Sequence, residues 1–250
     1  MKKVRDMNKN DKKLESKSLF VKQIAIPDNI QIIELKNVNC YLVNTEVGFI
    51  LIDTGFNKDR ALVEKYLEDN GIKPESKKLK LILLTHGDFD HTGNAAYLRA
   101  KYDAKIAMHK DDVGMVEYGD FSWNRNINII LSSIVKVIAF TLGMRLKKKD
   151  KFTPDLLLED KQDLTELGFL AKVISLPGHS KGSIGFITLD GDFFCGDILQ
   201  NVKQPEPASM VSDKEALEKS LRKIKGLEIG TIYPGHGKPF ELNALNFKIR

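Results

Sequence analysis

Residues 86–91, HGDFDH, place two histidines and two aspartates within one short stretch. The stretch follows an apolar run over residues 81–84, which is typical of a buried strand, so its polar side chains are expected at a strand end. Imidazole and carboxylate groups are ligands with which proteins hold divalent metal ions. The stretch therefore indicates a metal site at the end of a strand.

The other candidate ligands lie in loops of the same kind. Four of the five histidines in the chain follow apolar runs, and two of these lie in LPGHSKGS and YPGHGKP. A further aspartate lies in FFCGDIL, and the glycines in these loops let the backbone turn tightly around an ion. The candidate ligands are His86, Asp88, Asp90, His91, His179, Asp197 and His236. The fifth histidine, His109 in AMHKDD, matches no such motif, and we expect an ordinary strand-end residue.

The elements that must position these loops follow from the apolar pattern. Short apolar runs over residues 19–53, separated by Pro, Asp, Asn and Gly, predict strands. Helical spacing follows over 58–71, with Gly71 at the expected C-cap, and again over 93–102. Strand-like runs resume over 156–197, and a last helix over 213–226 precedes the strand GTIYP. This order predicts an α/β domain of two packed sheets with helices outside.

Composition limits the class of protein. The chain has 250 residues, 42% of them hydrophobic, which suits one domain over residues 18–250. Its 39 basic and 34 acidic residues are too evenly balanced to give a strong nucleic-acid signal. We expect a flexible basic tail over residues 1–17, and the absence of a signal-peptide pattern there favours a cytoplasmic protein. Cys40 and Cys195 are predicted to be reduced and buried.

The segment 118–149 interrupts the pattern, and we predict an inserted helical cap there. Its centre, INIILSSIVKVIAFTLGM over residues 127–144, is mostly apolar, but it is marginal against the length of about 20 apolar residues that a membrane span needs. We therefore expect no transmembrane span, although membrane contact by this segment stays open. A cap over the metal ions would give the site an apolar wall.

Five motifs, IDTG, THGDFDH, PGHSKGS, CGD and YPGHG, occur in an order that resembles the metallo-β-lactamase superfamily of hydrolases. The resemblance runs from about residue 19 to the C-terminus. The family's usual second motif is His-x-His-x-Asp-His, and Asp88 stands here in place of its second histidine. The resemblance implies a four-layer αββα sandwich, in which two mixed β-sheets are flanked by helices and the site lies at one edge between the sheets.

The resemblance also implies two divalent metal ions, with zinc the commonest in the family and iron or manganese as alternatives. One ion would be bound by His86, Asp88 and His179. The other would be bound by Asp90, His91 and His236. Asp197 would bridge the two ions, and Asp53 in IDTG matches a position that orients a ligand through a hydrogen bond.

Asp88 leaves two roles open, because a carboxylate reaches less far from the backbone than an imidazole. It is either a direct ligand, or it accepts a hydrogen bond from a water molecule and leaves the first site weak. As a ligand it would lower the charge of the site by one unit and offer a harder oxygen atom. Both effects favour iron or manganese relative to zinc, without excluding zinc.

These residues predict hydrolysis by a metal-bridging hydroxide, with Asp90 also available to accept a proton. The expected apolar wall favours a small-molecule ester, thioester or lactone. Phosphodiester cleavage is the alternative, although the large inserted domain of RNA-cleaving relatives does not fit between CGD and YPGHG. A di-iron redox protein, which would need an appended flavin domain, and a non-catalytic metal-binding protein are less favoured. The substrate, the native metal and the oligomeric state stay open.

Overall fold

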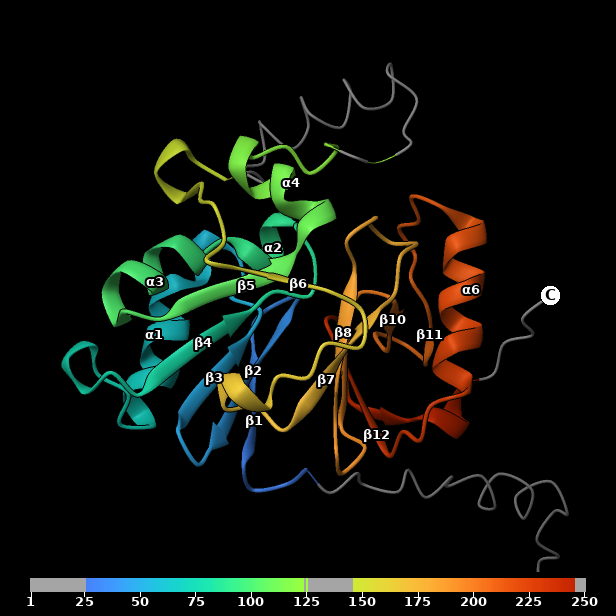
Figure 1. Ribbon diagram of the computed structural model, residues 1–250, viewed down its shortest axis with the longest axis horizontal. Helices are drawn as coiled ribbons and strands as arrows, with labels where there is room; N and C mark the ends of the chain where they lie inside the picture. The colour runs from blue at the N-terminus through green and yellow to red at the C-terminus, as the bar shows by residue number, and fades with distance from the viewer. Residues whose placement is uncertain (1–25, 124, 126–145, 246–250) are drawn as a thin grey trace, which may run out of the picture.

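The computed structural model describes residues 26–123, 125 and 146–245 of the chain (Figure 1). The basic tail predicted over residues 1–17 and the cap helix predicted over 127–144 lie outside these ranges, so both stay predictions. Within the described ranges, no helix has the length and apolar character required to cross a membrane. Cys40 and Cys195 are buried and unpaired, as the sequence predicts.

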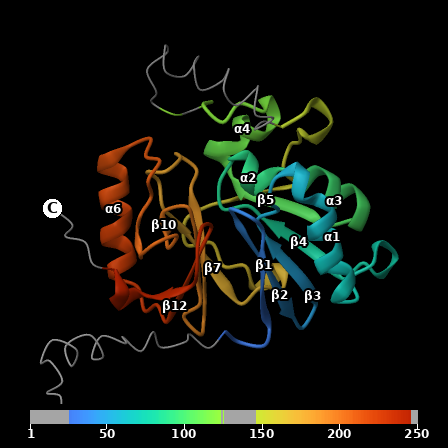
Figure 2. The ribbon, with the colours of Figure 1, turned by 180° about the vertical axis from the view of Figure 1, so that it is seen from behind.

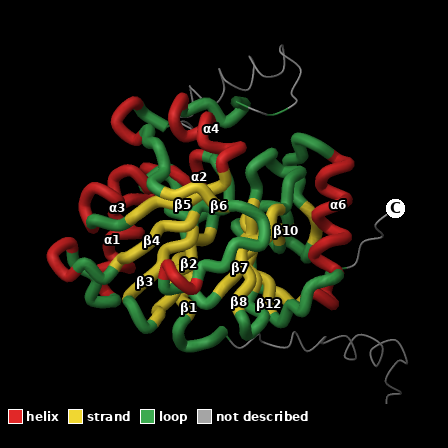
Figure 3. The backbone as a smooth tube through the Cα atoms, in the orientation of Figure 1, coloured by secondary structure: helices red, strands yellow, loops and turns green. Residues whose placement is uncertain are grey.

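Two mixed β-sheets form the centre of the molecule (Figure 3). The first sheet has the order β1-β2-β3-β4-β5-β6, antiparallel from β1 to β3 and parallel from β3 to β6. Its strands are β1 (Ile30–Glu34), β2 (Asn39–Thr45), β3 (Gly48–Ile52), β4 (Leu79–Leu83), β5 (Lys105–His109) and β6 (Leu156–Leu158).

The second sheet has the order β13-β12-β9-β8-β7, in which only β12 and β9 pair in parallel. Its strands are β7 (Ala171–Ser175), β8 (Ile184–Thr188), β9 (Phe193–Gly196), β12 (Thr231–Pro234) and β13 (Phe240–Glu241). A separate short pair consists of β10 (Leu199–Gln200) and β11 (Glu206–Pro207).

Helices cover the outer faces of both sheets (Figures 1 and 2). On the side of the first sheet lie α1 (Arg60–Asp69), α2 (Phe89–Thr92), α3 (Ala95–Tyr102) and α4 (Val113–Tyr118). The second sheet is covered by α6 (Lys214–Lys225), whose N-cap Asp213 accepts a hydrogen bond from the amide of Ala216 at 3.0 Å. Its buried residues Leu217, Leu221 and Ile224 recur at helical spacing and face the sheet.

Three apolar cores of the described residues lie between the layers, and strand β3 contributes side chains to two of them. Ile50 and Ile52 point into the core between the sheets, whereas Leu51 points into the core beneath the helices of the first sheet. This alternation follows from the two-residue period of a strand. A third core lies between the second sheet and α6, where Leu221 packs with Ile232. The four-layer αββα sandwich expected from the resemblance is confirmed.

The strand directions bring the polar loops to one edge. Strands β3 and β4 are parallel, and so are β9 and β12, so the loops that follow their carboxyl ends meet. The two sheets are joined directly at this edge by backbone hydrogen bonds. The amide of Asn39 donates to the carbonyl of Gly235 at 2.8 Å, and the amide of Ile184 donates to the carbonyl of Thr85 at 2.8 Å.

Candidate metal centre

Two sets of candidate ligands face each other at this edge, with Asp197 between them. The first set is His86, Asp88 and His179. The second set is Asp90, His91 and His236. Ligand atoms of His86, His179 and Asp197 lie within 4.8 Å of one another, and so do those of the second set. Each set takes residues from the loop and short helix α2 that follow β4, and from loops of the second sheet.

Distances within the first set suit a single ion. The Oδ2 atom of Asp88 lies 3.0 Å from Nε2 of His179 and 3.5 Å from Nε2 of His86. The Oδ2 atom of Asp197 lies 3.8 Å from Nε2 of both histidines. Ligand atoms about 2.1 Å from a tetrahedral ion are roughly 3.4 Å apart, so these separations match a metal site.

The second set has similar dimensions. The Oδ2 atom of Asp90 lies 3.8 Å from Nε2 of His91 and 3.6 Å from Nε2 of His236. Asp197 uses both of its oxygens here, since Oδ1 lies 3.2 Å from His91 Nε2 and Oδ2 lies 3.0 Å from His236 Nε2. Within the described part of the chain, Asp197 is therefore the carboxylate that lies close to both sets.

All four histidines turn the same nitrogen toward the centre. His91 Nδ1 lies 2.8 Å from Oδ2 of Asp53, and His86 Nδ1 lies 3.0 Å from the hydroxyl of Thr85, which itself donates to Asp53. His179 Nδ1 pairs with the carbonyl of Met210 at 2.8 Å, and His236 Nδ1 pairs with the carbonyl of Asn37. These outer acceptors hold the proton on Nδ1 in the neutral imidazole, which leaves each Nε2 lone pair directed inward. Asp53 thus occupies the orienting position expected for it.

Buried polar atoms without a hydrogen-bond partner gather at the same place. Among the described residues they include Nε2 of His86 and His91, Oδ1 of Asp88 and Oδ1 of Asp197. Leaving such atoms unpaired in the interior is unfavourable, so a cluster of them indicates a missing partner. Convergent imidazole and carboxylate groups at these separations fit divalent metal ions. His109 belongs to neither set, and its Nδ1 accepts a hydrogen bond from the amide of Asp111 at 3.2 Å.

Mutual attraction between the imidazoles and carboxylates changes their proton affinity. Burial lowers the pKa of His91, but the carboxylates of Asp197, Asp53 and Asp90 outweigh it and raise that pKa well above its usual value. The pKa of His236 is raised in the same way, chiefly by Asp197. Burial raises the pKa of Asp197, but the nearby His91 and His236 outweigh it and hold that pKa well below its usual range. Protons and metal ions would therefore compete for the same atoms.

This competition predicts opposite pH trends for the metal-free and metal-loaded proteins. His91, His179 and His236 have pKa values raised above the ordinary 6.5, so their stabilisation of the metal-free protein is complete below pH 6.5 and is lost as pH rises through the raised values. Metal binding at these histidines would release the protons, so metal affinity should rise over the same interval. Between pH 6 and pH 9, the melting temperature of the protein with chelator should fall as pH rises. The melting temperature of the metal-loaded protein should rise over the same interval. A chelated protein whose melting temperature rose over this interval would contradict the assignment.

Arg125 is a component of the site that sequence reasoning missed. Its side chain is 1% exposed, and its NH2 atom lies 2.7 Å from Oδ2 of Asp88 and 3.3 Å from Nε2 of His179. Burial raises the pKa of Asp88, but Arg125, His179 and His86 outweigh it and hold that pKa well below its usual range. No motif surrounds this arginine in the sequence, and a buried position could not be read from a segment predicted as a cap.

The contact with Arg125 changes the expected charge of the site. An aspartate paired with an arginine is neutral together, as is the imidazole that Asp88 replaces in the family motif. Asp88 therefore does not make the surroundings of the metal one unit more negative, as the sequence alone suggested. The expected preference for iron or manganese then rests only on the hardness of a carboxylate oxygen.

Asp112 is a second residue that sequence reasoning missed. It is fully buried and receives hydrogen bonds from the amide of Gly87 at 3.0 Å, the hydroxyl of Ser180 at 2.6 Å and the amide of Gly182 at 2.8 Å. Its carboxylate thus ties the loop that carries His86 to the loop that carries His179. In the sequence it stands in the charged stretch HKDD, where nothing distinguishes it from a surface acid.

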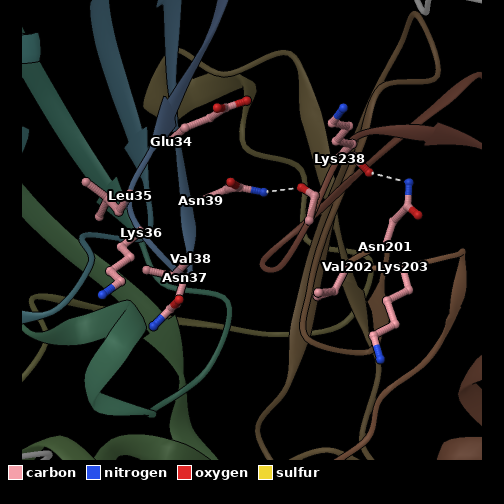
Figure 4. A pocket seen from close by; sticks show the side chains of 11 residues that line it. Glu34, Leu35, Lys36, Asn37, Val38, Asn39, Asn201, Val202, Lys203 and Lys238 are labelled. Atoms are coloured by element: carbon pink, nitrogen blue, oxygen red, sulfur yellow. Dashed lines mark hydrogen bonds between the residues drawn. The ribbon is translucent and has the colours of Figure 1, made fainter.

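A cleft of about 580 Å³ opens beside the centre (Figure 4). It lies between the turn after β1 and the loops that follow β10 and β12, and Gly237, next to His236, belongs to its lining. Lys36, Lys203 and Lys238 line it together with one acid, Glu34, which gives the cleft a net positive charge. A cleft of this charge favours a ligand that carries a negative group.

Residues 33–236 match the family model described as the metallo-beta-lactamase superfamily. Hydroxyacylglutathione hydrolase GloC of Haemophilus influenzae is 30% identical over 176 residues, which are 68% of this chain and 72% of GloC. Thioesterase pkgB of Emericella nidulans is 28% identical over 209 residues, which are 82% of this chain and 47% of pkgB. In the pairings with two further curated relatives, the match spans 65% and 61% of the relative's own length, which is less than two thirds.

A solved structure is also similar to this chain in its fold. The crystal structure of TTHA1623 in a di-iron-bound form is similar with a TM-score of 0.64 and 27% sequence identity. The match covers 88% of this chain and 96% of that chain.

Proposed function

The chain belongs to the metallo-beta-lactamase superfamily, and from this premise we propose that it is a binuclear metal-dependent hydrolase of small-molecule thioesters. The convergence of four inward-facing Nε2 atoms on the shared carboxylate of Asp197 carries the proposal. The two sets and Asp197 would hold the metal ions. The thioester substrate is favoured by the names of two relatives, a hydroxyacylglutathione hydrolase and a thioesterase.

Bound metal ions would supply an activated water as nucleophile and would polarise the carbonyl oxygen of the substrate. Other residues of the chain orient the side chains that would bind these ions. Asp53 and Thr85 fix the rings of His91 and His86, so that their lone pairs point inward. The side chain of Asp90 is 18% exposed, compared with 11% for Asp197 and 9% for Asp88. Asp90 is therefore the carboxylate best placed to exchange a proton with solvent during turnover.

The lysine-lined cleft supports a substrate with a negative charge away from the reacting carbonyl. Lys36 and Lys203 stand on opposite sides of the cleft, and Lys238 lies farther along the side of Lys203 (Figure 4). Binding energy from such a remote group would hold the acyl carbon beside the metal ions. An apolar acyl wall from the cap predicted over residues 127–144 stays a prediction.

A matched substrate panel tests the proposal. Protein loaded separately with Zn²⁺, Mn²⁺ or Fe²⁺, with its metal content measured, is given thioesters that share one acyl group and carry either an anionic or a neutral thiol. An aryl ester, a lactone and a phosphodiester complete the panel. We expect the anionic thioester to be preferred over the phosphodiester by at least about 100-fold in kcat/KM, because the alternatives differ in how they are bound in the transition state. A preferred phosphodiester, or metal-loaded protein without any turnover, would refute thioester hydrolysis.

A further inference from the structure

Arg125 contacts the atoms that a metal ion in the first set would use. Its NH2 group lies 2.7 Å from Asp88 Oδ2 and 3.3 Å from His179 Nε2. When His179 is neutral, its Nδ1 proton is held by the carbonyl of Met210, so the guanidinium faces the Nε2 lone pair. Asp88 Oδ2 itself lies 3.0 Å from His179 Nε2, so the guanidinium, the carboxylate and the imidazole contact one another where an ion of the first set would be bound.

The arginine is held firmly in this position. Its side chain is 1% exposed, its NH1 group contacts the sulfur of Met210 at 3.4 Å, and its amide donates to the carbonyl of Ser122 at 3.2 Å. Phe121 in the same turn packs edge-on against Phe89 of α2, with ring centroids 6.0 Å apart. The turn that carries Arg125 is thus packed on the helix that follows Asp88.

The second set has no such neighbour. Within the described ranges, the ion pairs of Asp90, His91 and His236 are with one another, with Asp197 or with Asp53, and none involves a lysine or an arginine. The two sets are therefore chemically unequal, although their ligand separations are alike. A metal ion entering the first set meets a positive charge that already contacts the ligand atoms, whereas no lysine or arginine of the described residues pairs with the ligands of the second set.

We propose that Arg125 is a positioning residue that pairs with Asp88 and opposes metal binding at the first set, so that the protein binds one metal ion tightly at the second set and another more weakly at the first. The inference rests on the proposed metal centre. Both the repulsion between the cations and the engagement of the lone pair of His179 act in this direction. Together the pair Asp88 and Arg125 takes the place of the family's neutral imidazole, with one added function, which is to set the order in which the two sites fill.

Metal titration of four proteins tests the proposal without using activity. Metal-free wild type, Arg125→Met, Asp88→His and the double variant are titrated with Co²⁺ and with Zn²⁺, followed by visible absorption and by calorimetry. Wild type should bind two equivalents whose affinities differ by at least about tenfold, as expected for a site next to an opposing charge. Arg125→Met should strengthen the weaker equivalent by about tenfold or more and leave the tighter one unchanged.

The remaining variants show whether Arg125 acts on metal binding through its charge or only supports the structure of the site. Asp88→His keeps the guanidinium against a neutral imidazole, so it should bind the weaker equivalent least well of the four proteins. The double variant restores a neutral set without the cation, so both of its equivalents should be tight. Arg99→Met is a matched control, because Arg99 is partly exposed and lies 3.5 Å from Asp155, outside both sets.

The outcomes are distinguishable from failure of the hydrolase proposal. If the Arg125→Met protein stays folded but binds the weaker equivalent less tightly than the wild type, or equally tightly, Arg125 does not oppose metal binding at the first set. If the double variant is no better than Asp88→His, the same conclusion follows even when the single arginine variant fails to fold. Wild-type protein that binds no metal at all would instead remove the metal centre itself.

Discussion

Asp197→Ala is expected to remove both metal ions and to lower kcat/KM by at least about 1,000-fold, because the metal ions supply the nucleophile. Its Oδ1 lies 3.2 Å from Nε2 of His91, and its Oδ2 lies 3.0 Å from Nε2 of His236 and 3.8 Å from Nε2 of His86. No other carboxylate among the described residues reaches both sets. Loss of this single side chain should therefore weaken both sites together, whereas loss of Asp90 should affect the second alone.

Elemental analysis of protein purified without chelator, with circular dichroism to verify folding, measures this prediction. Asp190→Ala is a suitable control, because Asp190 is an exposed aspartate in the turn between β8 and β9 of the same sheet. His109→Ala should likewise leave metal content and activity unchanged. An Asp197→Ala protein that kept two metal ions would show that the sets do not share this carboxylate.

Gly235→Ala is expected to disable the second set by steric overlap. A Cβ atom at this position would lie 2.2 Å from Oδ1 of Asp197 and 2.7 Å from Cε1 of His91, both closer than such contacts normally occur. His91 cannot move aside easily, since it is fully buried and its Nδ1 is held by Asp53 at 2.8 Å. Displacing a ligand by even about 1 Å should lower kcat/KM by roughly 100-fold and release the metal ion of this set.

Gly226→Ala provides the matched control for this steric effect. It is also a glycine of the second half of the chain, but the nearest heavy atom to its added Cβ would be the carbonyl oxygen of Lys223 at 3.5 Å, an ordinary contact. Metal content and kcat/KM should therefore equal those of the wild type. If Gly235→Ala also retained both metals and full activity, the tight packing of this loop around Asp197 would have no part in holding the site.

Much of the fold could be predicted because local pattern and final structure agree. The strand predicted before residue 86 is β4, and the helix predicted over 213–226 is α6. The candidate ligands could be found because each follows a strand and carries a chemistry that few residue types share. The role of Asp53 could be predicted for the same reason, since its motif places it directly after β3.

The missed residues depend on contacts between distant parts of the chain. Arg125 meets Asp88 across 37 positions, and Asp112 meets Gly182 across 70 positions. Neither residue type is unusual on a surface, and burial of a charge becomes evident only when its partner is known. The expected charge of the site was wrong for this reason, because the counter-charge of Asp88 comes from outside every motif.

Both ligand sets straddle the boundary between the two sheets. His91 follows β4 of the first sheet, whereas His236 follows β12 of the second, and the backbone bond from Asn39 to Gly235 crosses the same boundary. A bound ion would therefore act as a staple across the sandwich, and any fluctuation that parts the sheets would have to break coordination first. Metal release and amide hydrogen exchange at this boundary would then report the same opening event. The dissociation rate of the metal would therefore measure how often the two sheets separate.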